Sequence, residues 1–423
     1  MGADSRFLLA EVNMILKIID ECRISGSSNL LPILNLGTQP LANSLKKSPM
    51  DSEDKFPLSI SFCPDSSLLQ LNETIDKKTL FKNYIWVTGT SKTTKRYASK
   101  LYNQLIQIAA PSRTDFILEI ASNDGTFLQP FIKNYYTNVL GVDPAVNIVQ
   151  KANECGIPTL SAFWNSSLAE ELLVDRGAAK IILARNVVPH VSNLSSVIEG
   201  IATLLDEGGI GAIEFHDAGK IQSELHYDSI YHEHLCYFSI QSITFLLNLF
   251  NLIPFHIEPS LISGGSWVIF FSNKQKETSF ALQRAVDLEL QNSVNSIEKW
   301  ENFARLTLKH KDHTLEMFNS IYGKKVVGFG SSARSQTYLN YCGIDNNYIS
   351  AIIDNNPMKQ GLFTPGSSIP IVDIKSGLGL NPEIIVILAW NFQEEIISSC
   401  LSAGYKGKFM SPLPNKLHYV EKS

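Results

Sequence analysis

Short, mostly apolar runs alternate with longer amphipathic stretches through the middle of the chain. Such runs are typical of strands that are buried on both faces of a parallel sheet. They are Phe116–Ile120, Val139–Val142, Ile181–Ala184 and Gly211–Phe215. The stretches between them suit crossover helices. Residues 106–275 are therefore predicted to form a doubly wound α/β domain.

The flanking regions follow other patterns. Residues 276–320 lack glycine and proline and carry apolar residues at helical spacing, which predicts a linking helix. Apolar runs at Lys325–Phe329, Ile349–Ile353 and Ile384–Leu388 then predict a second α/β domain, so that 276–423 form the C-terminal part. Residues 1–105 are rich in proline and loops and contain two cysteine sites, which indicates a small N-terminal domain.

Composition narrows the class of protein. The chain has 423 residues, of which 44% are hydrophobic and 18% charged, enough for two or three cored domains. A formal charge of -5 gives no electrostatic case for nucleic acid or an anionic membrane. No apolar run reaches the roughly 18 residues of a membrane span. With no basic leader and only scattered cysteines, we expect a cytoplasmic protein, and its oligomeric state stays open.

The first predicted strand runs into a turn of small residues, Ala121 to Gly125, followed by a helical stretch. Such a turn lets a ligand approach the backbone and the free N–H groups of a helix start. Asp143, at the tip of the next strand, suits the ribose hydroxyls of S-adenosylmethionine. The predicted cofactor-binding residues are Glu119, Ala121, Asn123, Gly125, Asp143 and Asn186. An alternative is a Rossmann-like domain for another ligand or none, which Ala121, in place of a glycine, favours.

The densest group of titratable side chains is Tyr231-His232-Glu233-His234. Histidine can accept a proton near neutral pH, and a neighbouring carboxylate can orient it. Three interpretations remain open: a general base with helpers, a structural histidine pair, or a metal site. A metal site lacks a third ligand at suitable spacing.

A series of separate motifs, in order, extends the picture over nearly the whole chain. With these motifs the chain resembles the sugar C-methyltransferases, which act on nucleotide-linked 4-keto-deoxysugars. The motifs are Leu36–Asn43, Phe56–Leu58, Trp86–Ser91, Glu119–Gly125, Ala184–His190, Ile230–His234, Ser263–Ser266, Asn340–Ile344, Lys359–Gly361 and Thr364–Gly366.

The resemblance implies a zinc-binding N-terminal domain, a class I (Rossmann-like) methyltransferase domain and a C-terminal Rossmann-like domain. It implies that His234 is the base that removes the proton from carbon 3 of the sugar, with Tyr231 and Glu233 in the same pocket. S-adenosylmethionine would then methylate the enolate, a step that needs no metal. The expected partner is a nucleotide sugar, contacted by Trp86, His190, Arg334 and Lys359.

Two alternatives qualify those substrate contacts. Trp86 can equally be a residue of a hydrophobic core, and Arg334 and Lys359 can be solvated surface charges. The identity of the sugar and of the nucleotide stays open.

One departure from the resemblance concerns zinc. The family has two Cys-x-x-Cys pairs, but here Ser25 and Ser66 stand where the second cysteine of each pair would be, leaving Cys22 and Cys63. A serine hydroxyl is a poor zinc ligand beside thiolate. We therefore expect that zinc is lost, the alternative being a weak site completed by Asp65.

The C-terminal domain contains a second glycine-rich turn, Gly328-Phe329-Gly330, with Asp354 after the next strand. This pattern is typical of dinucleotide sites and supports an alternative function, a nicotinamide-dependent sugar-nucleotide oxidoreductase. The lost cysteines keep a third hypothesis open, a non-catalytic relative of the family.

Overall fold

The computed structural model describes residues 15–80, 88–90, 92–260, 264–415 and 417–420. The middle of the chain forms a seven-stranded sheet in the order β12-β13-β10-β9-β6-β7-β8. Its strands are Phe116–Ile120 (β6), Val139–Asp143 (β7), Thr159–Ser161 (β8), Ala179–Arg185 (β9), Leu205–His216 (β10), Ile253–Pro259 (β12) and Ser266–Ser272 (β13). All are parallel except β13, which runs antiparallel between β10 and β12. The α/β class expected for this region is confirmed.

Helices cover both faces of this sheet. They are Lys92–Ala109 (α3), Gln129–Lys133 (α4), Val146–Glu154 (α5), Ser166–Arg176 (α6), Leu194–Leu204 (α7), Ala218–Ser223 (α8) and Ile240–Asn248 (α9), with 3-10 turns at Thr88–Thr90 (η1), Val188–His190 (η2) and Tyr227–Ser229 (η3). In β6, Phe116 and Leu118 pack into one hydrophobic cluster with α6 and α7, whereas Ile117 packs into another with α3, α4 and α5. Burial on both faces explains why β6 lacks a polar alternation.

The N-terminal part forms a four-stranded antiparallel sheet in the order β11-β4-β3-β2. Its strands are Leu31–Pro40 (β2), Lys55–Cys63 (β3), Leu68–Leu71 (β4) and Cys236–Tyr237 (β11). A strand pair, Leu16–Ile18 (β1) with Glu73–Ile75 (β5), and the short helix Lys77–Leu80 (α2) complete this part. Because β11 directly follows the histidine-rich segment 231–234, this sheet lies next to that segment.

The C-terminal part contains a six-stranded sheet in the order β16-β15-β14-β17-β18-β19, parallel except for β19. Its strands are Val326–Phe329 (β14), Ile352–Ile353 (β15), Ile371–Val372 (β16), Ile384–Ile387 (β17), Lys408–Ser411 (β18) and His418–Val420 (β19). Its helices are Ala333–Cys342 (α12), Ile374–Gly379 (α13) and Gln393–Ser402 (α14), with a 3-10 turn at Trp390–Phe392 (η4). The expected second Rossmann-like unit is confirmed.

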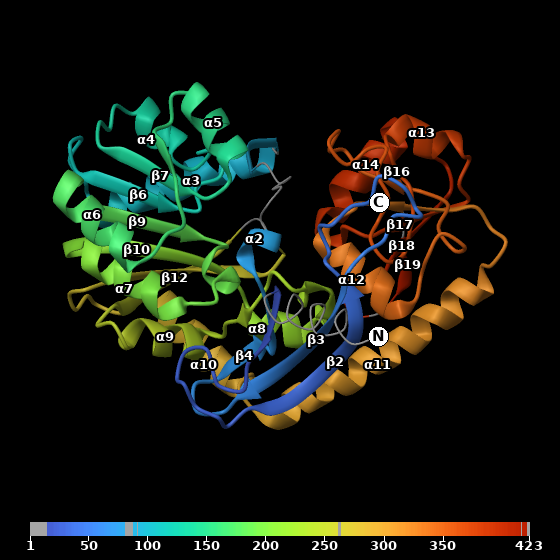
Figure 1. Ribbon diagram of the computed structural model, residues 1–423, viewed down its shortest axis with the longest axis horizontal. Helices are drawn as coiled ribbons and strands as arrows, with labels where there is room; N and C mark the ends of the chain where they lie inside the picture. Colours follow the sequence, from blue (N-terminus) through green and yellow to red (C-terminus); the bar gives the residue numbers. More distant parts are fainter. Residues whose placement is uncertain (1–14, 81–87, 91, 261–263, 416, 421–423) are drawn as a thin grey trace, which may run out of the picture.

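The linking segment is two helices, Phe280–Gln291 (α10) and Ile297–Ser320 (α11), which corrects the prediction of a single helical stretch over 276–320. Ser293 adopts a left-handed conformation with φ 52, which breaks α10, and the Ser296 side chain caps α11 by accepting from the N–H of Lys299. Figure 1 shows α11 extending beneath β2 towards the C-terminal unit, and α11 packs against both β2 and α12.

The predicted boundary between residues 105 and 106 falls inside α3, whose Tyr97, Leu101 and Leu105 belong to the core of the central unit.

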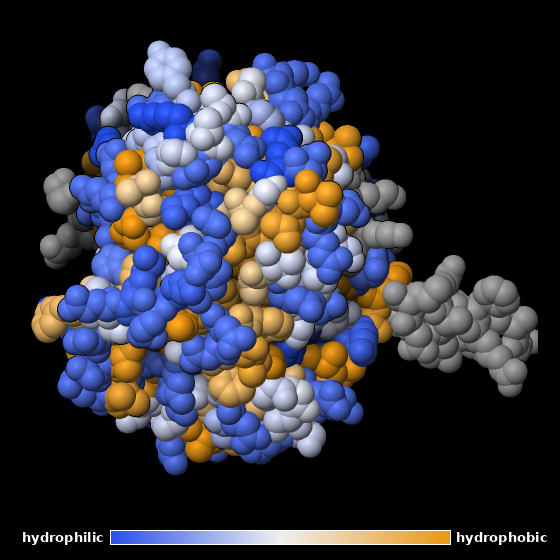
Figure 2. Space-filling view, turned by 90° about the vertical axis from the view of Figure 1, so that its left-hand side faces the viewer, coloured by the Kyte–Doolittle hydropathy of each residue, from blue (hydrophilic) through white to orange (hydrophobic). Residues whose placement is uncertain are grey.

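On the side of that unit turned away from the C-terminal unit, hydrophilic and hydrophobic residues are interspersed (Figure 2). None of the helices in the described part of the chain is long and apolar enough to cross a bilayer.

Candidate active site

The turn after β6 has a strongly bent backbone. Ala121, Asn123 and Gly125 all have positive φ, at 54, 51 and 73. A Cβ on Gly125 would lie 2.5 Å from the Ile157 side chain, so this position requires glycine on grounds of both conformation and space. Ala121 adopts a left-handed conformation that glycine ordinarily adopts. The backbone therefore has the bend of a glycine-rich turn although the sequence has alanine at this position.

Two carboxylates lie at this edge of the sheet, on the neighbouring strands β6 and β7. Asp143 accepts hydrogen bonds from the N–H groups of Asn123 and Ala145, both at 2.9 Å, and burial nevertheless raises its pKa. Glu119 is only 2% exposed, and its Oε2 has no hydrogen-bond partner among the residues that the structure describes. Burial raises the pKa of Glu119 to about 8. A buried carboxyl oxygen without a partner fits a cationic ligand such as S-adenosylmethionine.

The end of β9 completes this edge and includes residues that the sequence did not single out. Asn186 has φ 48, and its N–H donates to the Glu214 main-chain oxygen at 3.0 Å. The preceding Arg185 forms a buried ion pair with the Glu214 carboxylate at 2.7 Å, and its guanidinium carbon lies 3.2 Å from the centre of the Phe127 ring. In the sequence, this pair could have been suspected from Glu214, because it is a charged residue inside the apolar run of β10.

The segment after η3 holds His234 between two partners. Its Nδ1 lies 2.9 Å from the carbonyl oxygen of Ser229, and its Nε2 lies 2.6 Å from the Tyr231 hydroxyl. Because a carbonyl only accepts, Nδ1 carries the hydrogen, and the Nε2 lone pair accepts from Tyr231. A main-chain carbonyl, rather than a carboxylate, therefore orients this histidine. Burial and the neighbouring His190 hold the pKa of His234 well below its usual range, so it is neutral at pH 7.

His190, from η2, is brought beside His234, with ring centres 4.7 Å apart. Its Nδ1 donates to the main-chain oxygen of Glu233 at 2.7 Å, and burial lowers its pKa to about 4. The Glu233 carboxylate points elsewhere, because both of its oxygens accept from Nδ2 of Asn43, at 2.9 and 2.8 Å. Burial raises the pKa of Glu233 to about 7, and the hydrogen bond from Asn43 limits the rise.

The histidines of this segment do not share a metal-binding geometry. His232 contacts the carbonyl oxygen of Pro57 through Nε2 at 3.0 Å, whereas both nitrogens of His234 face Ser229 and Tyr231. Among the residues that the structure describes, no group of three or more histidine, cysteine, aspartate or glutamate side chains is arranged to hold a metal ion.

Comparisons with known proteins cover all three parts of the chain. Residues 92–254 match a family model described as "Methyltransferase domain", residues 261–414 one described as "C-methyltransferase C-terminal domain", and residues 22–81 one described as "Putative zinc binding domain". The C-methyltransferase NovU from Streptomyces niveus is 28% identical over 409 residues, which cover 95% of this chain and 97% of NovU. The chain belongs to the S-adenosylmethionine-dependent C-methyltransferases.

Two solved structures similar to this C-methyltransferase each match less than half of it. A protein from Pyrococcus horikoshii OT3 is 14% identical with a TM-score of 0.36, covering 47% of this chain and 100% of its own. An S-adenosylmethionine-dependent methyltransferase from Clostridium acetobutylicum is 12% identical with a TM-score of 0.34, covering 42% of this chain and 91% of its own.

The predicted substrate contacts of the C-methyltransferase have partners within the protein. Arg334 binds both carboxylate oxygens of Asp228, at 3.0 and 2.8 Å, and stacks on Trp390, whose indole N–H donates to the same carboxylate at 2.9 Å. Lys359 donates to the main-chain oxygen of Ser331 at 2.6 Å. Neither is a solvated surface charge, since their side chains are 17% and 12% exposed. Trp86 lies outside the described residues.

The C-terminal glycine-rich turn is filled by protein. A Cβ on Gly330 would lie 2.4 Å from the Cβ of Ala389, and one on Gly328 would lie 2.8 Å from Leu388. Asp354 accepts from the N–H groups of Ser331 and Asn356, each at 2.8 Å. The two glycines are therefore explained by close packing, and they are not evidence for a dinucleotide site in this C-methyltransferase.

The four positions that correspond to the zinc ligands meet in space. Cys22 Sγ lies 3.1 Å from Ser66 Oγ, and Ser25 Oγ lies 3.8 Å from Cys63 Sγ. Burial favours the neutral thiol of Cys22, but hydrogen bonds from Ser25 and Ser66 outweigh it and lower the pKa. Two thiols and two hydroxyls do not fit a tetrahedral zinc site. The Asp65 carboxylate, the alternative fourth ligand, accepts from Ser27 and Asn29.

Proposed function

We propose that this C-methyltransferase transfers a methyl group to carbon 3 of a nucleotide-linked 4-keto-deoxysugar. The observation that carries the proposal is the half-buried His234, whose Nδ1 is held by a carbonyl and whose Nε2 lone pair is directed at a hydroxyl. A proton next to a ketone is acidic enough for such a base to remove. The resemblance to sugar C-methyltransferases supports the choice of a ketosugar.

In this proposal His234 is the base. Its Nε2 accepts the proton from carbon 3, which leaves the electron pair on the enolate of the sugar. The Ser229 carbonyl keeps Nδ1 protonated and fixes the ring plane, so that the same lone pair faces the substrate in every turnover. S-adenosylmethionine, when bound, supplies the methyl group as an electrophile on a sulfonium.

Tyr231 is proposed to stabilise the enolate oxygen. Its hydroxyl donates to His234 in the substrate-free protein, so binding of the ketone requires the O–H to turn from Nε2 to the oxygen at carbon 4. This exchange frees the base as it places a donor on the developing charge. His190 supports the arrangement by holding the main-chain oxygen of Glu233 beside the base.

The cofactor is proposed to occupy the edge of the central sheet formed by β6, β7 and β9. Asp143 suits the ribose hydroxyls, the bent turn brings main-chain N–H groups close, and Glu119 provides a buried acceptor for positive charge. Asn186, with its left-handed backbone at the end of β9, lies at the same edge.

A screen of product masses tests the proposed function. The protein is incubated with S-adenosylmethionine and a panel of nucleotide-linked sugars, half with a 4-keto group and half with the matching 4-hydroxyl. We expect the mass gain of one methylene with 4-ketosugars alone. Methylation of the 4-hydroxyl sugars would contradict an enolate route. Calorimetric binding of NAD without binding of S-adenosylmethionine would contradict the cofactor assignment.

We also propose that the N-terminal domain folds without zinc. The buried pairs Cys22–Ser66 and Ser25–Cys63 occupy the ligand positions, and Cys63, Leu58 and Phe62 belong to the hydrophobic cluster of this sheet. Apolar packing then supplies the stability that metal binding would otherwise provide.

A further inference from the structure

The connection between β2 and β3, residues 41–54, contacts both the active site and the C-terminal unit. Asn43 near its start binds the Glu233 carboxylate, and Lys46, three positions later, binds the C-terminal unit. Three residues span at most about 11 Å of chain, so anchoring Lys46 confines Asn43 to a small volume. This connection is called the β2–β3 loop below.

The contact between Asn43 and Glu233 joins an exposed residue to a buried one. Asn43 is exposed, whereas Glu233 is only 7% exposed. One amide nitrogen reaches both carboxylate oxygens, so it fixes the rotation of the carboxylate as well as its position. Of the side chains next to Glu233, His232 and His234 turn to other partners, and His190 contacts only its main-chain oxygen. An exposed residue of another domain thus holds a buried carboxylate of the active site.

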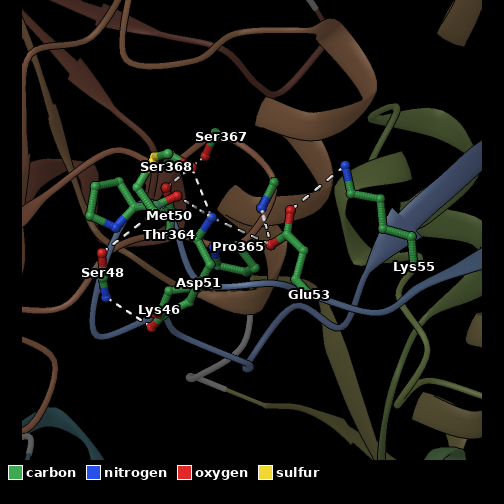
Figure 3. A network of polar contacts seen from close by, with 12 residues as sticks. Lys46, Ser48, Met50, Asp51, Glu53, Lys55, Thr364, Pro365, Ser367 and Ser368 are labelled. Carbon is green, nitrogen blue, oxygen red and sulfur yellow. Dashed lines mark hydrogen bonds and ion pairs between the residues drawn. The ribbon is translucent and has the colours of Figure 1, made fainter.

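Lys46 fastens the loop to the C-terminal unit. Its main chain forms an antiparallel bridge with Phe363, with hydrogen bonds of 2.9 and 2.8 Å. Its side chain is only 7% exposed, and its ammonium donates to Ser368 Oγ at 2.9 Å and to the Pro49 carbonyl at 3.1 Å. Figure 3 shows Lys46 reaching from the loop into the turn that carries Thr364, Ser367 and Ser368.

Glu53 provides a second anchor at the other end of the loop. Its Oε2 accepts from the N–H of Gly366 at 2.8 Å and lies 3.9 Å from the Lys46 ammonium, so the buried lysine is partly neutralised. A Cβ on Gly366 would collide with the Asn340 side chain of α12, which shows how tightly this turn is seated on the helix. The loop is therefore attached to a rigid part of the C-terminal unit.

We propose that Asn43 is a positioning residue for the Glu233 carboxylate, and that docking of the β2–β3 loop on the C-terminal turn 363–368 holds it in place. The active-site carboxylate is then set by three parts of the chain at once. The inference rests on the proposed function only in taking Glu233 as part of the active site.

The pH dependence of methyl transfer distinguishes positioning from mere support. The amide of Asn43 favours ionised Glu233, so its removal raises the pKa of Glu233 above about 7. We expect Asn43→Ala to move the acidic limb of the kcat/KM profile to higher pH, and Asn43→Asp, which adds a negative charge, to move it further. Lys46→Met should give a smaller shift in the same direction. Lys47→Met is the matched control, because Lys47 is exposed and should leave the profile unchanged.

Hydrogen–deuterium exchange of the full chain tests the same proposal without substrate. In Asn43→Ala and Lys46→Met we expect amides of residues 230–235 to exchange several-fold faster, and those of the cofactor turn 121–125 to be unaffected. Unchanged exchange in both variants would overturn the proposal. So would an unshifted pH profile for Asn43→Ala with a substrate from the screen. Should no ketosugar be methylated, the proposed function fails and the exchange experiment alone decides this inference.

Discussion

At the scale of single residues, the site combines neutral histidines with uncharged or partly charged carboxyls. His234 and His190 are kept neutral by burial, whereas the same burial raises the pKa values of Glu119 and Glu233 to about 8 and about 7. Apart from the ion pair of Arg185 with Glu214, these groups leave little charge in the site until ligands arrive. A cationic cofactor and an anionic enolate would then meet little competing charge.

The role of His234 leads to the first prediction at this scale. We expect His234→Ala to lower methyl transfer by about a hundredfold or more, because it removes the Nε2 lone pair that is proposed to accept the proton. Tyr231→Phe removes the donor to the enolate oxygen but keeps the base, so it should lower both methyl transfer and deuterium exchange at carbon 3, each by less than His234→Ala does. The measurements are product mass and deuterium uptake in D₂O. A loss of exchange in Tyr231→Phe as large as or larger than that in His234→Ala would contradict the assignment of the base to His234.

Glu119 leads to a second prediction, on cofactor binding. With a pKa of about 8, Glu119 is mostly protonated at pH 7, and a cation beside it favours ionisation, so S-adenosylmethionine binding should release a proton. The affinity should therefore increase as the pH rises from 7 to about 8.5. Calorimetry in buffers of different ionisation enthalpy measures both effects. In Glu119→Gln the affinity should lose this pH dependence, and a retained dependence would show that another group titrates.

At the scale of elements, the proposed cofactor-binding residues lie at or next to the ends of strands. β6, β7 and β9 end at one edge of the central sheet, which brings together residues distant in sequence, such as Glu119, Asp143 and Asn186. In the N-terminal sheet, Cys63 ends β3 and packs with Cys22 from the turn before β2. Strand ends thus place both the proposed cofactor residues and the positions that correspond to the zinc ligands.

The four positions that correspond to the zinc ligands lead to a prediction about metal. Because Cys22, Ser25, Cys63 and Ser66 already lie in contact, Ser25→Cys combined with Ser66→Cys should create a four-thiolate site that binds one zinc per chain. The unchanged protein should contain little zinc. Elemental analysis of both proteins after purification, and the thermal stability of each with a chelator, are the measurements. Stoichiometric zinc in the unchanged protein would refute the proposed loss.

At the scale of the whole molecule, the three parts of the chain depend on one another. β11 completes the N-terminal sheet with residues that follow His234, Arg334 of α12 binds Asp228 beside the active site, and the β2–β3 loop joins the C-terminal turn. A single hydrophobic cluster contains buried residues from all three parts. Unfolding of one part should therefore expose groups of the others.

The stability of the whole protein should depend on pH in a predictable way. Burial lowers the pKa of many histidines, namely His190, His216, His226, His232, His234 and His310. As the pH falls below 6.5, these histidines bind protons in the unfolded chain but stay neutral in the folded chain, so the free energy of unfolding decreases.

Buried acids act in the opposite sense. Asp217, Glu233 and Glu119 have raised pKa values of about 6, about 7 and about 8, so they stay protonated in the folded protein while the unfolded chain ionises. Their contribution declines as the pH rises to about 8, which predicts a stability maximum near pH 7. Thermal melting between pH 4 and pH 9 measures the profile, and a maximum below pH 5 would contradict the dominance of the histidines.

How far sequence reached can be judged from particular elements. The runs Phe116–Ile120 and Ile384–Leu388 predicted strands that the structure contains almost to the residue, because burial on both faces leaves a continuous apolar signature. The long stretch 276–320 was predicted less well, since the break at Ser293 depends on a local left-handed turn rather than on glycine or proline. The roles assigned to the site residues stay predictions for the experiments above.

The sequence by itself determined the two α/β units, the bent turn after β6 and the histidine-rich segment 231–234. Each of these depends on residues that are neighbours in the chain, whose sterics and apolar spacing act locally. Only the tertiary structure decided which polar groups pair over long distances, such as Asn43 with Glu233 and Arg334 with Asp228. Those pairs depend on how finished elements dock, and the chain carries no local pattern that specifies their partners.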